Sequence, residues 1–125
     1  MAAIAQDYVS QAEQVIRGLS KNRQGAYELT TTQLRSLLSL TAQLFDEAEQ
    51  SGPTLSKPLQ DKVQYLRVRF VYQAGREPAV REFVGSADLL PTLAKIGDSR
   101  ERLLEFCRYM EALVAYKKFL DPKDK

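Results

Sequence analysis

Hydrophobic residues recur every three to four positions along most of the chain, which is the period of an amphipathic α-helix. A first stripe runs through the N-terminal segment, and a second follows Thr30 or Thr31, either of which can cap a helix. The two stripes comprise Ala5, Tyr8, Val9, Ala12, Val15, Ile16 and Leu19, then Leu34, Leu37, Leu38, Thr41, Leu44, Phe45 and Ala48. The pattern predicts two helices, the second ending at the Ser-Gly-Pro sequence of residues 51–53.

A third helix is predicted to begin at Pro58, because proline suits the first helical position. Val68 and Val71 lie on nearly the opposite side of this helix from its main apolar stripe. The main stripe consists of Leu59, Val63, Leu66, Phe70 and Ala74. Apolar residues on two sides predict that this helix is central in the fold, with Gly75 as a candidate C-terminal cap.

The C-terminal half predicts two short helices, over 79–85 and 89–96, and a long last helix with Asp98 as its cap. The last helix carries a main apolar stripe and a second seam. These comprise Leu103, Phe106, Cys107, Met110, Leu113 and Val114, and then Tyr109, Tyr116 and Leu120. Phe70 and Leu113 are expected to be buried at the centre of the protein.

Short connections between these helices favour antiparallel packing. The expected fold class is therefore all-α: a small helical bundle of about five to six helices with up-down packing. Residues 1–125 are expected to form one domain, with 120–125 as a frayed tail. Residues 51–57 are a candidate hinge, through which the first two helices could exchange onto a neighbouring copy.

The chain of 125 residues has one cysteine and no histidine. It therefore lacks the Ser-His-Asp and Cys-His arrangements of hydrolases, and also the ligands of a structural zinc site. We expect a binding protein without catalytic residues, metal or cofactor. No basic and apolar leader and no apolar run of membrane-spanning length is visible, so we expect a cytoplasmic protein without membrane association.

The charge is unevenly distributed, although the formal net charge is only +2. Between Lys57 and Arg81 there are six basic and two acidic residues, so this segment carries +4 and the remainder −2. Such asymmetry indicates an acidic partner, with nucleic acid the first candidate.

Lys62, Arg69 and Arg76 recur every seven residues and would line one edge of the third helix, with Tyr65 and Tyr72 beside them. Cations at this spacing suit the backbone of single-stranded or A-form RNA, and tyrosine rings can stack on bases. Alternatively, the row is a solvated edge and the tyrosines are half-buried in the core. Arg76 joins the row only if the helix continues through Gly75.

Two further cations are weaker candidates on spacing alone. Arg35 lies off the apolar stripe of the second helix, as many surface residues do. Lys57 precedes Pro58 at a helix N-terminus, where backbone N–H groups can hold an anion, but an ordinary loop lysine would look the same.

Three stretches carry a family resemblance. The sequence LTTTQLR at 29–35 is similar to a Leu-Thr-Thr-x-Gln-Ile-Arg opening, QYLRVRFVYQAGRE at 64–77 to a central block, and FCRYMEALVAY at 106–116 to a C-terminal block. Together with Phe83-Val84 and Ile96-Gly97, they resemble the small helical subunit of type III-A CRISPR effector complexes, the Csm type, over about residues 29–119.

The resemblance implies a non-catalytic α-helical protein that stacks in several copies as an inner filament. It also implies contact with the target RNA paired to the guide RNA, largely through the backbone, while other subunits cleave. The matching basic positions are Arg35, Arg67, Arg69 and Arg76, to which we add Lys57 and Lys62 on charge and position. Arg67 points away from the edge formed by the other cations of the third helix.

Two hypotheses follow. The first is an RNA-contacting subunit of a type III-A CRISPR ribonucleoprotein whose partners are single-stranded target RNA, guide RNA, other subunits and copies of itself in a filament. The second is a helical protein–protein adapter whose basic face docks an acidic partner subunit. Affinity for generic RNA that falls steeply with salt separates the first from the second.

Overall fold

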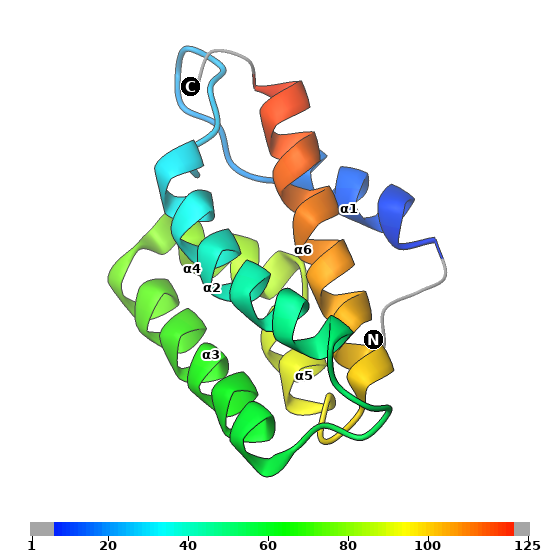
Figure 1. The fold of residues 1–125 in the computed structure, drawn as a ribbon. Coiled ribbons are helices and arrows are strands. Elements are labelled where there is room, and N and C mark those ends of the chain that lie inside the picture. Colours follow the sequence, from blue (N-terminus) through cyan, green and yellow to red (C-terminus); the bar gives the residue numbers. More distant parts are fainter. Residues whose placement is uncertain (1–6, 122–125) are drawn as a thin grey trace.

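The computed structural model describes residues 7–121, which form an all-α fold, as predicted (Figure 1). Its helices are α1 Tyr8–Arg17, α2 Thr31–Glu49, α3 Lys57–Arg76, α4 Pro78–Ser86, α5 Leu89–Ala94 and α6 Arg100–Leu120. Within this range there is no β-strand beyond two isolated bridges, and no helix is long and apolar enough to cross a membrane. Ala5 of the first predicted stripe lies outside the described residues.

The long helix α6 lies at the centre of the bundle and packs against α1, α2 and α5 (Figure 1). Helix α3 packs on α2, α4 and α5 and forms one side of the molecule. The prediction that the third helix is central is therefore wrong. Val68 and Val71 are 59% and 52% exposed, because no other helix covers the side of α3 that carries them.

The predicted core is confirmed at its centre, where Phe70 and Leu113 are fully buried. All five residues of the main stripe of α3 are buried as well. Helix α6 buries side chains around more of its circumference than the other helices, as its central place requires. They are Leu103, Phe106, Cys107, Tyr109, Met110, Leu113 and Lys117.

Two helix ends differ from the predicted ones. Helix α3 runs through Gly75 to Arg76, so Gly75 is not its cap. Ser99, not Asp98, caps α6, and its hydroxyl accepts a hydrogen bond from the Arg102 N–H at 3.2 Å. The Asp98 carbonyl accepts from the Leu55 N–H at 2.7 Å, so this residue pairs with the α2–α3 linker and the helix begins after it. At α2, Thr30 forms a capping box with Gln33.

The α2–α3 linker is anchored to the start of α6. Leu55 is buried, and the Arg100 N–H donates to the Pro53 carbonyl at 3.2 Å. The Arg100 guanidinium also donates to the carbonyls of Ala48 and Glu49 at the C-terminal end of α2. Straightening the candidate hinge at 51–57 would break these contacts.

The C-terminal end of α6 is also anchored. Asp121, which the sequence places in a frayed tail, is buried and accepts a hydrogen bond from the Tyr27 N–H at 3.1 Å. Its carboxylate lies 3.4 Å from the ammonium of Lys117, which is only 1% exposed. The hydrogen bond between Asp121 and Tyr27 joins the end of α6 to the α1–α2 loop. Residues 122–125 of the predicted tail lie outside the described part of the chain.

Candidate nucleic-acid interface

Helix α3 lies on an outer side of the bundle (Figure 1). Because it is continuous from Lys57 to Arg76, Lys62, Arg69 and Arg76 lie along one edge of it. Because α3 does not end at Gly75, Arg76 belongs to the same row as the other two cations. Steps of seven residues separate their Cα atoms by about 10.5 Å along the helix axis. The edge therefore extends over roughly 21 Å.

Lys62 forms an ion pair with a residue of the neighbouring helix α2. Its Nζ lies 2.8 Å from Oε1 of Glu47 on α2, and both side chains are about half exposed. Such exposed ion pairs contribute only about 0–1 kcal/mol, so a phosphate could compete with the carboxylate. Lys62 is nevertheless the most neutralised member of the row.

Arg69 and Arg76 both lie against the ring of Tyr72. Their guanidinium carbons are 5.6 and 6.0 Å from its centroid, within the range of cation–π attraction. Across residues 7–121, neither arginine forms an ion pair with a carboxylate. Their positive charges therefore remain available to an anionic partner.

Tyr65 and Tyr72 are 61% and 53% exposed, so the alternative that places them half-buried in the core is wrong. Val68 lies between them on the same exposed side of α3, although the sequence analysis assigned it to a second buried side. Its helical angle could have indicated this exposure, because Val68 is about 60° from Tyr65 around the helix axis but about 160° from the buried Phe70.

The other three predicted residues do not lie on this edge of α3. Arg67 is exposed about 160° around the helix from Arg69, and its guanidinium donates to Gln64 at 3.5 Å. Lys57 is exposed at the first residue of α3, about 18 Å along the axis from Arg69. Arg35 is exposed on α2. Three of the six candidates therefore share this edge.

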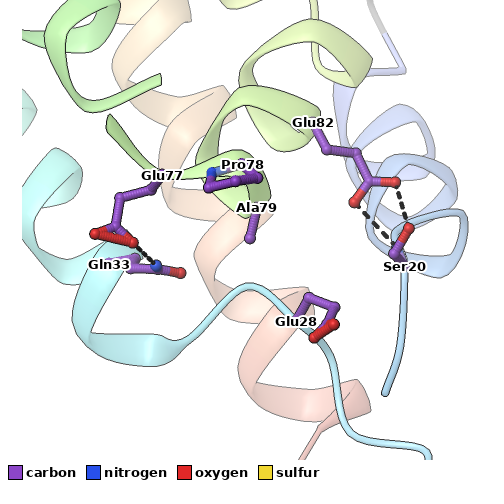
Figure 2. Close-up of a pocket in the computed structure, with 7 residues that line it drawn as sticks. All are labelled: Ser20, Glu28, Gln33, Glu77, Pro78, Ala79 and Glu82. Atoms are coloured by element: carbon purple, nitrogen blue, oxygen red, sulfur yellow. Dashed lines mark hydrogen bonds between the residues drawn. The ribbon is translucent and has the colours of Figure 1, made fainter. Parts of the chain in front are cut away.

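An acidic hollow of about 560 Å³ lies where the α1–α2 loop meets the α3–α4 junction (Figure 2). Its walls carry Glu28, Glu77 and Glu82. Figure 2 shows Glu77 bonded to the side-chain amide of Gln33, and Glu82 accepting from both the N–H and the hydroxyl of Ser20. Three carboxylates make this hollow unsuited to RNA phosphates.

Comparison with known proteins agrees with the family suggested by the sequence. A family model described as Csm2 Type III-A matches residues 3–123. The chain is 71% identical over 126 residues to "CRISPR system Cms protein Csm2" of Mycobacterium tuberculosis, covering all of both chains.

Two further relatives carry the same name. The protein of Streptococcus thermophilus is 50% identical over 119 residues, which cover 95% of each chain. That of Enterococcus italicus is 42% identical over 94 residues, which cover 73% of this chain and 67% of the relative. The match along nearly the whole length shows that this chain belongs to the Csm2 family of type III-A CRISPR systems.

Proposed function

We propose that the chain is a non-catalytic small subunit of a type III-A CRISPR ribonucleoprotein in the cytoplasm. Several copies stack in this complex, and each contacts the backbone of target RNA paired to guide RNA through the basic edge of α3. The complex serves antiviral defence guided by RNA. The observation that carries the RNA contact is the pair of guanidinium groups of Arg69, which is partly buried, and Arg76, which is exposed: they are aligned on one edge of α3 and pair with no carboxylate of residues 7–121.

This edge suits a backbone contact because arginine donors match phosphate oxygens without reading bases. Contacts of this kind position the RNA and are independent of its sequence, as a subunit that serves many different guides requires. Arg35, Lys57, Lys62 and Arg67 are proposed as additional contacts, each able to meet phosphates from its own position on α2 or α3.

The non-catalytic part of the proposal rests on the side chains that the chain offers. It has no histidine to act as a general base. Its one cysteine, Cys107, is buried, and burial raises the pKa of its thiol to about 12. The thiolate that would act as a nucleophile is therefore scarce at neutral pH.

The test is RNA binding by the double variant Arg69→Ala/Arg76→Ala, measured by fluorescence anisotropy over a range of salt concentrations. We expect weaker binding by a similar factor for unrelated sequences, and a salt slope that falls by about 0.7–0.9 for each lost phosphate contact. A matched control, Arg23→Ala/Lys118→Ala, removes two exposed cations outside α3 and should leave binding largely unchanged.

Unchanged RNA binding in the folded Arg69→Ala/Arg76→Ala protein would contradict the RNA contact. If that variant instead lost only its affinity for a purified acidic subunit of the complex, the edge would belong to a protein–protein adapter. Circular dichroism of both variants checks that helix content is retained.

A further inference from the structure

Helices α2 and α6 lie side by side (Figure 1), and a groove of about 120 Å³ lies between them. Its apolar lining comes from Leu38, Ala42 and Phe45 of α2 and from Cys107 of α6. An apolar cavity of about 150 Å³ can hold a benzene molecule, so this groove can receive most of one aromatic ring. Its size therefore suits a single large apolar side chain of a partner.

Phe119 is an aromatic side chain that the fold leaves in water. It is 75% exposed on α6, more than any other large hydrophobic residue of the described range. Its ring cannot enter the groove of its own chain, because Phe119 lies about 12–18 Å further along the axis of the same helix than Glu111 and Cys107. Only a second copy of the chain can therefore bring this ring to the groove.

The charges beside the ring and the groove are complementary. Lys118, next to Phe119, is exposed, and the rim of the groove carries the exposed carboxylates of Asp46 and Glu111. Arg108 is the one cation that lines the groove. Within residues 7–121, none of these four charged side chains forms an ion pair. The two carboxylates therefore remain available to the ammonium of a neighbouring copy.

We propose that Phe119 of one copy inserts into the groove between α2 and α6 of a second copy, with Lys118 beside the carboxylates of the rim. This proposal rests on the stacking of copies proposed above and names the two surfaces that meet. The copy that provides its Phe119 keeps its own groove free for the next copy. The contact is therefore head to tail and can repeat along a series of copies.

A contact that is anchored by one side chain is weak, since stable interfaces bury about 800 Å² on each partner. Free chains should therefore stay mainly monomeric in dilute solution. Copies that are held next to each other on one RNA have an effective concentration of about 1 mM, at which a weak contact is occupied. The insertion thus orders copies within an assembled complex.

Sedimentation equilibrium of the full chain at concentrations up to about 1 mM measures this contact. We expect Phe119→Ala to weaken self-association about tenfold or more, because the anchoring ring is lost. Ala42→Arg fills the groove and places a cation opposite Lys118, so it should weaken association to a similar extent. The matched controls Val9→Ala and Gln43→Arg make the same kinds of change at exposed sites outside the groove and should have no effect.

Mixing the two defective variants tests the contact directly. The Phe119→Ala protein retains an open groove, and the Ala42→Arg protein retains its ring. Together they should form a one-to-one pair, although each alone stays monomeric. The pair should not grow further, because its outer ends are a missing ring and a filled groove. The wild type should instead pass beyond two copies as its concentration rises.

Several outcomes would overturn the proposal. Equal association of Phe119→Ala and the wild type would show that copies stack through another surface, or form the dimer with exchanged helices, which does not involve this ring. If only Ala42→Arg weakens association, another side chain fills the groove. A wild type that stops at two copies would reject a head-to-tail contact. If the wild type stays monomeric both alone and on a long RNA, the proposed stacking fails together with the insertion. Circular dichroism checks that every variant retains its helix content.

Discussion

The ring of Phe70 on α3 meets the ring of Phe106 on α6, with centroids 6.1 Å apart and planes tilted by 53°. Both side chains are fully buried. This aromatic contact joins the helix that carries the candidate RNA surface to the central helix of the bundle. Pairs in such tilted arrangements contribute about 0.5–1.5 kcal/mol beyond the area that they bury.

Truncation of this core should therefore destabilise the protein strongly. Phe70→Ala should lower the free energy of unfolding by about 3–5 kcal/mol, and Leu113→Ala by about 2–5 kcal/mol, because each leaves a cavity among packed side chains. Urea denaturation followed by circular dichroism measures both values. Phe119→Ala, at an exposed site, should stay within about 0.5 kcal/mol of the wild type. A Phe70→Ala protein as stable as the wild type would contradict the packing described here.

The buried pair of Lys117 and Asp121 makes a second prediction. Asp121→Ala leaves the Lys117 ammonium without this carboxylate and the Tyr27 N–H without its acceptor. Removing one partner of a buried ion pair typically costs about 3–5 kcal/mol. Thermal unfolding of the variant tests this, with Lys118→Ala on the exposed side of the same turn as control. Equal melting temperatures for Asp121→Ala and the wild type would show that the pair does not anchor the end of α6.

Because the phenol of Tyr109 is buried, we expect the free energy of unfolding to fall in alkaline solution. Its buried hydroxyl donates to the Ala87 carbonyl at 3.1 Å, and burial raises the pKa of the phenol from 10.0 to about 12. The folded state therefore retains a proton that the unfolded state loses. The contribution of Tyr109 to the free energy of unfolding is therefore fully present below pH 10, and it declines as the pH rises towards about 12.

Unfolding free energies at several pH values between 8 and 12 would measure this effect, with Tyr109→Phe as the matched variant. At neutral pH the variant should be about 1 kcal/mol less stable, because the Ala87 carbonyl loses its donor. Above pH 10 this difference should shrink, since the variant has no phenol to ionise at this site. A difference that stays constant with pH would contradict a raised pKa of Tyr109.

The anchored linker predicts a chain that is mainly monomeric in dilute solution, with an exchanged dimer as a minor species. Exchange would straighten residues 51–57 and break the backbone hydrogen bonds of Pro53 and Leu55 to the start of α6. The unexchanged bundle buries the same apolar stripes without the entropic cost of association. Light scattering over a concentration series tests this, and a dimer that persists at nanomolar concentration would refute it. Leu55→Ala, which loosens the linker, should raise the dimer fraction.

The sequence by itself determined the helical fold and the inward side of each helix. The main stripe of α3, from Leu59 to Ala74, is buried as its 3.6-residue period predicts, because burying this one side removes all five side chains from water together. It also determined that Lys62, Arg69 and Arg76 share an edge, since this follows from helix geometry alone. The family resemblance likewise rests on linear motifs that require no tertiary information.

Only the tertiary structure decided which helix is central and which surfaces stay in water. The spacing of Val68 shows that α3 has a second apolar side, but whether another helix covers that side depends on where the connections carry the neighbouring helices. The α2–α3 linker folds back on Ser99 and Arg100, and α6 rather than α3 takes the centre. The partners of the basic edge, Glu47 for Lys62 and Tyr72 for the two arginines, depend on this packing and on side-chain conformations, which no periodicity specifies.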